Sequence, residues 1–416
     1  MSTEGQLNTW ISRAFELGAS DLHFEPDKGD KMRVRMRVDG QLRLLETVAG
    51  FKQFMSRIKL MADLDVNERS VPLDGRVDVL KHVPGCPGLD IRLSTLPCLN
   101  GEKAVMRLID ARKLSMKLDQ LGFSKKMLRL YEPHIHAPSG LILHVGPTGS
   151  GKTTSLYAAI QTIKRGDINI QTVENPVEYQ VFGITQTQVD PEHGLTFPRV
   201  LRALLRQDPD VILVGEIRDP ETAEIATEAA MTGHLVLSTL HTNDAVGTVV
   251  RLLEMGIAPY CIAYSLRAVV SQRFARRLCQ HCKRSIQPPE RVIRVTGSRR
   301  PIYQAQGCAK CGREGYKGRQ PLFEFLPNSP ALKNAVYASA TPDNLQAVAK
   351  KNGLISLWED GLEKVWAGHT SLEEVLRCVK GVKAALAGTG PKQGGRRPPP
   401  PARRPATASA RSARRR

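Results

Sequence analysis

The sequence predicts an α/β protein with a parallel-rich sheet, preceded by a smaller α+β domain and carrying a subdomain with a four-cysteine zinc site. Short apolar runs alternate with helix-length segments after residue 140. A glycine-rich loop joins one of these runs to a helix at residue 146. Two Cys-x2-Cys pairs follow at residues 279 and 308. The first two observations predict the α/β domain, and the third predicts its zinc-binding subdomain.

The first 115 residues alternate between helical and extended patterns. Helical periodicity appears near the start and again over residues 51–64, while strand-like alternation appears over 21–25, 31–38, 75–80 and 89–95. The dipeptide Asp39-Gly40 is typical of a hairpin turn. We therefore expect residues 1–115 to form a small α+β domain.

The second domain is expected over residues 116–387, with the zinc-binding subdomain at about 272–322. Its apolar runs suit strands buried on both faces, and they cover residues 141–145, 168–173, 211–214 and 235–240. The segments 153–164 and 198–206 have helix length. This alternation predicts a parallel sheet with crossover helices.

The charge is concentrated at the end of the chain. The 416 residues carry a formal net charge of +19, but residues 388–416 contain nine Lys or Arg and no Asp or Glu. This Pro/Arg-rich tail lacks large apolar side chains, so we expect it to be disordered. No apolar run reaches eighteen residues and no secretion signal begins the chain. We expect a cytoplasmic location, where cysteines stay reduced.

The glycine-rich loop predicts a phosphate site. It follows the apolar run 141–145 and opens a helix, so its amides and the helix N-terminus converge on phosphate. Lys152 is the expected partner of the β- and γ-phosphates, and the Thr153 hydroxyl is the expected Mg²⁺ ligand. The pattern indicates ATP and Mg²⁺ as cofactors. The nucleotide-binding candidates are Gly146, Pro147, Thr148, Gly149, Ser150, Gly151, Lys152, Thr153 and Thr154, the last of which also suits a plain helix residue.

Carboxylates follow two of the predicted strands. Glu178 comes after the run 168–173, and Glu216 follows the run 211–214. Because the carboxyl ends of parallel strands meet at one edge of a sheet, both are candidates to hold the metal shell or orient water. His234 and His241 flank the run 235–240, and His241 could sense phosphate. Solvated acids and structural histidines are the alternatives.

The four regularly spaced cysteines predict a closed metal site. Cys279-x2-Cys282 and Cys308-x2-Cys311 present two pairs of thiolates separated by 25 residues. Four protein ligands leave no open position for catalysis, so the zinc is expected to be structural. Buried free cysteines or a redox pair are the alternatives.

Several segments together resemble one family, the type II secretion and type IV pilus assembly ATPases of the PulE type, within the secretion superfamily of P-loop ATPases. The segments GPTGSGKTT, TVENPVEY, LRQDPDVILVGEIRDPETA and TGHLVLSTLHTNDA resemble its Walker A, aspartate box, Walker B and histidine box. GASDLHFEP and MRVDG upstream, and QRFARRLCQHC and GCAKCGREGYKGR downstream, are also similar. The resemblance covers about residues 17–380.

The resemblance implies a RecA-like core in a hexameric motor whose ATP cycle moves its domains against each other. Glu178 matches the catalytic glutamate of the aspartate box, Glu216 the Walker B glutamate, and His234 and His241 the histidine box. Arginines of the smaller domain close over the nucleotide phosphates in this family. The matching positions here are Arg76, Arg92 and Arg107.

The same resemblance implies work in a type II secretion or type IV pilus system. It implies an inner-membrane platform protein as partner, peripheral association with that membrane, and assembly as the direction of work, because retraction motors of the family lack the four cysteines. A motor that moves nucleic acid is the alternative, although no RNA-binding motif accompanies the basic residues. The tail could contact anionic lipid or stay solvated.

Two departures from the family pattern stand out. Asn175 occupies a position where Asp is usual, so a nucleotide-bound scaffold with little hydrolysis is a further alternative. The chain also begins close to the family's second amino-terminal domain, which leaves its docking partner open.

Overall fold

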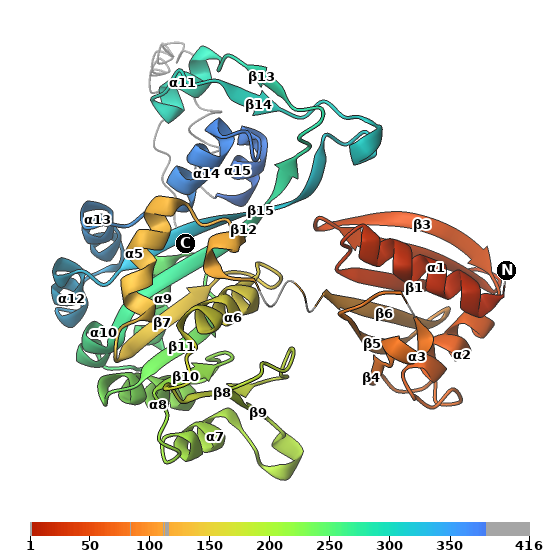
Figure 1. Ribbon diagram of the computed structural model, residues 1–416, viewed down its shortest axis with the longest axis horizontal. Helices are drawn as coiled ribbons and strands as arrows, with labels where there is room; N and C mark the ends of the chain where they lie inside the picture. Colours follow the sequence, from red (N-terminus) through yellow and green to blue (C-terminus); the bar gives the residue numbers. More distant parts are fainter. Residues whose placement is uncertain (1, 84, 111, 113–115, 380–416) are drawn as a thin grey trace, which may run out of the picture.

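The computed structural model describes residues 2–83, 85–110, 112 and 116–379, which form two main sheets joined near residue 115 (Figure 1). The expected disordered tail, 388–416, lies outside the described residues. The first sheet has six strands in the order β3-β2-β1-β6-β5-β4, and helices α1, α2 and α3 accompany it. The elements of this part are α1 (Thr3–Glu16), β1 (Asp21–Asp27), β2 (Lys31–Val38), β3 (Gln41–Ala49), α2 (Phe51–Met61), β4 (Leu73–Val77), α3 (Val79–His82), β5 (Leu89–Cys98) and β6 (Gly101–Asp110).

Local signals explain how this first part folds. Ser2 caps α1 by accepting a hydrogen bond from the Gly5 amide, and the apolar face of the helix is buried. The expected hairpin is confirmed, with Asp39 and Gly40 both at positive φ between β2 and β3. The strand expected over 75–80 is partly wrong. Asp78 accepts from the Lys81 amide and starts the short helix α3 instead.

The second sheet has seven strands in the order β15-β12-β7-β11-β10-β8-β9. Pairs between β12, β7, β11, β10, β8 and β9 are parallel, whereas β15 is antiparallel to β12, which confirms a mixed α/β domain with a parallel-rich sheet. Its elements up to β12 are η1 (Leu118–Leu121), α5 (Lys125–Ile135), β7 (Gly140–Val145), α6 (Lys152–Ile163), β8 (Ile170–Glu174), β9 (Thr185–Gln188), η2 (Pro191–His193), α7 (Phe197–Leu204), β10 (Val211–Val214), α8 (Pro220–Met231), β11 (Leu235–Leu240), α9 (Ala245–Glu254), α10 (Pro259–Ser265) and β12 (Leu266–Leu278).

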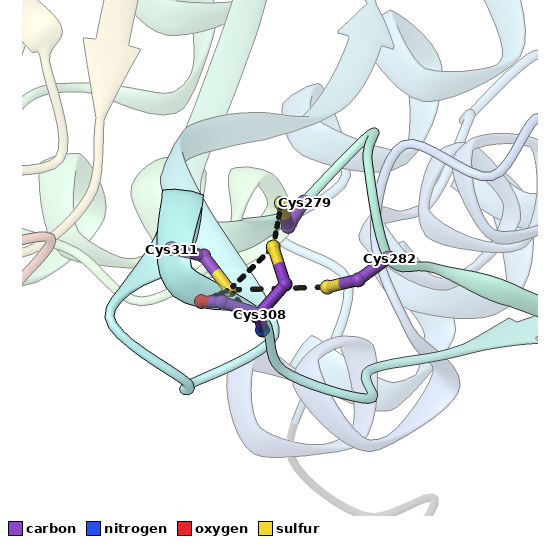
Figure 2. Close-up of side chains that lie close together, drawn as sticks. All are labelled: Cys279, Cys282, Cys308 and Cys311. Atoms are coloured by element: carbon purple, nitrogen blue, oxygen red, sulfur yellow. Dashed lines mark hydrogen bonds between the residues drawn. The ribbon is translucent and has the colours of Figure 1, made fainter.

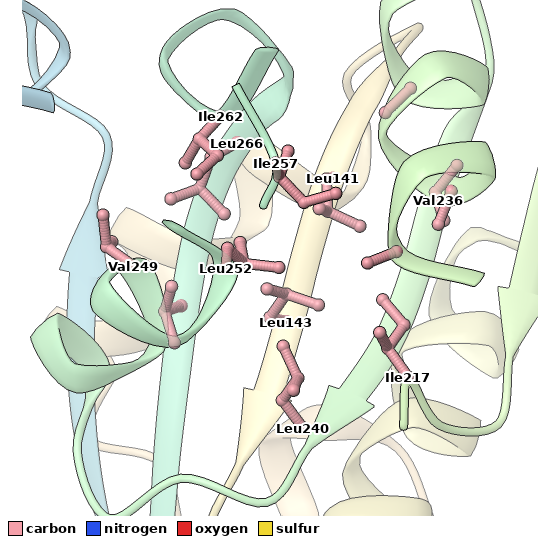
Figure 3. Packing of buried hydrophobic residues seen from close by; sticks show 14 of the residues in the cluster. Leu141, Leu143, Ile217, Val236, Leu240, Val249, Leu252, Ile257, Ile262 and Leu266 are labelled. Atoms are coloured by element: carbon pink, nitrogen blue, oxygen red, sulfur yellow. The ribbon is translucent and has the colours of Figure 1, made fainter. Parts of the chain in front are cut away.

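Helices cover both faces of this sheet. One apolar cluster joins the strands to α7, α8, α9 and α10, with Leu141 and Leu143 of β7 facing Val249 and Leu252 of α9 (Figure 3). A second cluster packs α5 and α6 on the opposite face. Because every residue of β7 and β11 is buried, these two strands form the centre that supports the loops at the sheet edge.

The chain after β12 adds a small cysteine-containing subdomain and four helices. A two-stranded sheet of β13 and β14 with α11 stands beside the main sheet (Figure 1). Within the described residues no helix is long and apolar enough to cross a membrane. The remaining elements are β13 (Arg284–Ile286), α11 (Glu290–Thr296), β14 (Ile302–Gln304), η3 (Ala309–Cys311), β15 (Tyr316–Pro327), α12 (Pro330–Tyr337), α13 (Pro342–Lys351), α14 (Leu357–Trp366) and α15 (Leu372–Cys378).

Candidate nucleotide and metal sites

The glycine-rich loop leaves the central strand β7 and runs directly against β12. Gly146 has φ 143° and Gly151 has φ 90°, conformations that favour glycine. A Cβ atom at Gly146 would lie 2.5 Å from the Gln272 carbonyl oxygen, and one at Gly151 would lie 2.8 Å from Gln272 Nε2. Gln272 also accepts a 2.7 Å hydrogen bond from Ser155 of α6. The loop therefore packs closely against β12, and a hydrogen bond joins β12 to α6, the helix that follows the loop.

Lys152 begins α6 and points back over the loop. Its ammonium donates to the carbonyl oxygens of Gly146 at 2.8 Å and Pro147 at 3.3 Å. Burial lowers the pKa of Lys152, Glu216 opposes this effect and Arg273 adds to it. A buried cation held only by two carbonyl oxygens is well suited to a nearby anion.

The loop residues fit a bound triphosphate with its metal. The Ser150 hydroxyl is buried and has no hydrogen-bond partner among the described residues. A Cβ at Gly149 would meet nothing within 4 Å, so open space lies over the loop. The first turn of α6 leaves backbone amides without intrahelical partners, and its dipole favours negative charge. Thr153 in that turn is partly buried and supplies a hydroxyl.

Glu216 and His241 lie together beside this loop. Strands β10 and β11 are parallel neighbours, so the residues that follow them meet at the same sheet edge. Glu216 Oε2 lies 2.7 Å from Arg218 Nε and 3.6 Å from His241 Nε2. Burial and the charge of Lys152 lower the pKa of His241, although Glu216 opposes them. The imidazole is therefore mainly neutral at pH 7.

Two glutamates, one that ends β8 and one four residues beyond it, have different surroundings. Glu174 is buried and accepts hydrogen bonds from the Tyr157 hydroxyl at 2.5 Å and the Thr172 hydroxyl at 2.6 Å. Glu178 is only partly buried and forms a 2.7 Å ion pair with Arg92 of the first sheet. Burial raises the pKa of Glu178, while Arg92 and Arg107 lower it. Glu178 is thus the more accessible of the two carboxylates.

The three candidate arginines form a row across the first sheet, but only one reaches the core. Arg76, Arg92 and Arg107 are register partners on β4, β5 and β6. Arg92 donates to the Val177 carbonyl and pairs with Glu178. Arg76 and Arg107 instead pair with Asp90 and Asp21 on their own sheet. In this arrangement the structure does not bring these two arginines to the loop.

The structure also separates His234 from the loop. His234 precedes β11, and the Gly140 amide that starts β7 donates to its carbonyl oxygen. His241 lies seven residues further along the chain, past the other end of β11, so the Cα atoms of the two histidines are about 23 Å apart at opposite sheet edges. His234 Nδ1 donates to the Ala229 carbonyl instead. Within one chain, the structure therefore does not bring His234 to the phosphate loop.

The four cysteines converge as expected from their spacing (Figure 2). Their sulfur atoms lie within 4.8 Å of one another, with separations of 3.9 Å for Cys279 and Cys308, and 3.8 Å for Cys282 and Cys311. Four thiolates at about 2.3 Å from a tetrahedral zinc ion would be about 3.8 Å apart. The amides of Cys308 and Gly315 donate to Cys311 Sγ. The donor set therefore fits a closed zinc site.

Two further contacts connect the cysteine segment to the first sheet. Arg43 pairs with Glu314 at 2.6 Å, and the Gly318 amide donates to Asp39 at the hairpin tip. No sequence pattern indicated these contacts. Gln272, Arg273 and Arg218 lie in segments that resemble the family, but their positions around the loop are recognised only once distant strands are paired.

The mixed α/β sheet and the glycine loop at the end of its central strand define a P-loop protein. A family model described as "Type II/IV secretion system protein" matches residues 2–377. The chain belongs to this family.

Curated relatives include two pilus assembly ATPases named PilB and one secretion ATPase. The chain is 45% identical over 376 residues to PilB of Thermus thermophilus, covering 88% of this chain and 42% of the relative. It is 43% identical to PilB of Pseudomonas aeruginosa, covering 90% and 67%. It is also 43% identical to the type II secretion system ATPase E of Vibrio cholerae, covering 90% and 75%. The chain thus spans less than half of the Thermus relative.

Solved structures show the same fold. The pilus retraction motor PilT with bound ADP is 25% identical, covers 90% of this chain and 97% of its own, and superposes with a TM-score of 0.63. The ATPase DotB of Legionella pneumophila is 20% identical, covers 93% and 97%, and has a TM-score of 0.67. The second likeness concerns the fold alone.

Proposed function

We propose that this chain is a motor ATPase that hydrolyses ATP to drive assembly of pilus or pseudopilus subunits in a type IV pilus or type II secretion system. One observation carries the proposal: Lys152, Glu216 and His241 meet at the edge of a P-loop sheet, and Arg92 closes onto Glu178 from the other sheet. The names of the relatives, pilus assembly and secretion ATPases, supply the process.

The position of each residue indicates its proposed role. Lys152 and the loop amides would bind the β- and γ-phosphates, and Thr153 would ligate Mg²⁺, which supplies charge neutralisation when bound. Glu216 and Glu178 are the carboxylates placed to hold and orient water. His241 beside Glu216 is neutral and can donate or accept one hydrogen bond. Arg92 supplies positive charge from the other sheet.

The wider organisation is proposed from the same family. Residues 1–115 form the second amino-terminal type of domain, residues 116–387 form a RecA-like ATPase domain, and residues 272–322 hold a structural zinc ion. Arg76 and Arg107 would approach the nucleotide only after the domains move. The chain would work as a cytoplasmic homohexamer attached peripherally to the inner membrane through a platform protein. The sulfur geometry supports zinc, and the family's cysteine-bearing motors favour assembly over retraction.

The proposal is tested by measuring ATP hydrolysis by the wild-type protein and by the Glu216→Gln variant. Wild-type protein should release phosphate in a Mg²⁺-dependent reaction, and the variant should lose about 10²- to 10⁴-fold in kcat, the range for a lost acid–base group, while still binding a fluorescent ATP analogue. Glu132→Gln, an exposed glutamate on α5, is the matched control and should behave as wild type. Equal phosphate release by the Glu216 variant and the wild type would reject the proposal.

A further inference from the structure

The loop that carries His241 is held by side chains from the β12–β15 pair. This loop, residues 241–244, joins the end of β11 to the start of α9. Arg273 of β12 donates from Nη2 to the Asn243 carbonyl at 2.7 Å and lies 3.3 Å from its side-chain oxygen. The arginine end of the contact is fixed, because Arg273 belongs to β12 and is paired with Leu322 of β15.

The far end of the loop is held by a second side chain on the same face. Glu324 of β15 lies opposite Ser271 of β12, two residues before Arg273, so both side chains point toward α9. Glu324 is buried and accepts a 2.6 Å hydrogen bond from the Ala245 amide, the first residue of α9. The loop is thereby anchored next to its last residue, Asp244.

His241 has little else to fix it. Half of its side chain is exposed, and its 3.6 Å approach to Glu216 is too long for a strong hydrogen bond. The position of His241 therefore depends largely on its loop, which is held by Arg273 and, from α9, by a 2.7 Å hydrogen bond between the hydroxyls of Thr242 and Thr248. The only side chain described by the structure that donates to the Asn243 carbonyl is Arg273. Within the described residues, Arg273 Nε is buried and makes no hydrogen bond, and the hydrogen bonds of Nη2 both go to Asn243.

We propose that Arg273 is a positioning residue, which holds Asn243 so that His241 faces Glu216 and the phosphate loop. The inference rests on the proposed ATPase function and adds a residue to it. Arg273 also lies close enough to add to the positive potential at Lys152, so a direct phosphate contact is the competing role. The two roles predict different kinetics.

A double-mutant cycle distinguishes the positioning role of Arg273 from a direct contact with phosphate. Arg273→Gln should lower kcat about ten- to hundredfold with little change in KM, the cost of misplacing a catalytic group by about an ångström. In a His241→Gln background the same change should have almost no further effect, because its only route of action is gone. Arg273→Lys, which keeps one donor, should recover part of the loss. Arg165→Gln, an exposed arginine before β8, is the control.

Two results would overturn the inference. One is a full loss of kcat from Arg273→Gln in the His241→Gln background, and the other is a rise in KM at constant kcat. A second measurement does not depend on hydrolysis. The ring resonances of His241, assigned by comparison with the His241→Gln variant, should shift in Arg273→Gln and stay unchanged in Arg165→Gln. An unmoved His241 resonance would exclude the positioning role even if wild-type protein hydrolyses no ATP.

Discussion

The buried carboxyl of Glu324, which holds the end of the His241 loop, has a raised pKa that can be tested by its effect on stability. The pKa of Glu324 is raised to about 7, mainly by burial and also by the charge of Asp244, although the Ala245 amide and Arg273 act in the opposite direction. A carboxyl with a raised folded-state pKa stabilises the fold while it is protonated. That stabilisation is complete below the unfolded pKa of 4.5 and is lost as the pH rises through about 7.

The magnitude follows from the two pKa values. The difference between 4.5 and about 7 corresponds to about 3 kcal/mol at pH 8, where the folded protein must ionise a buried group. Glu324→Gln removes the ionisation and keeps an oxygen that can accept from the Ala245 amide. We therefore expect the variant to be more stable than wild type by up to about 3 kcal/mol at pH 8, and equal to it near pH 4.5.

The assay is urea denaturation followed by circular dichroism between pH 4.5 and 8. Glu374→Gln provides a control of opposite sign. Burial alone would raise the pKa of Glu374, but hydrogen bonds from Arg377 and Arg276 outweigh it, and the pKa is lowered. This variant should be less stable than wild type at pH 8, with the difference vanishing as the pH falls. A Glu324 variant whose stability relative to wild type does not change with pH would refute the reasoning.

Two further predictions concern the loop and the cysteines. Gly146→Ala should weaken binding of a fluorescent ATP analogue at least tenfold, because its Cβ would meet a β12 carbonyl oxygen at 2.5 Å, whereas Gly149→Ala should cost only about 1 kcal/mol of backbone strain. Equal affinities of the two variants would contradict the close approach. Cys308→Ser should reduce bound zinc from about one ion per chain and lower the melting temperature, measured by elemental analysis and calorimetry. The exposed Cys98→Ser should change neither, and retained zinc in the Cys308 variant would exclude it as a ligand.

The sequence was most informative where structure depends on neighbours along the chain. The P-loop, the apolar strands before Gly146 and Glu216, and the two cysteine pairs are local patterns with a physical requirement for each residue. Their placement at one sheet edge follows from parallel topology, which the alternation of strands and helices already indicates. The structure accordingly brings Lys152, Glu216 and His241 together.

What could not be predicted depends on pairing between distant segments. The sequence could not show that β12 lies along the phosphate loop, because no motif connects Gln272 to Gly146. Nor could the sequence show that Arg92, and not Arg76, contacts the second domain. That contact depends on how the first sheet lies against the second domain. The motif also could not show that His234 and His241 lie apart, because it records order along the chain, and a strand of six residues separates its ends by about 20 Å.

The long strand β12 couples two sites that would otherwise be independent. Gln272 touches the phosphate loop, and seven residues later the same strand delivers Cys279 to the metal cluster. An extended chain of that length spans about 23 Å with little freedom to compress. The phosphate loop, the cysteine cluster and, through Glu314 and Gly318, the hairpin of the first domain are therefore connected by one strand and two polar contacts.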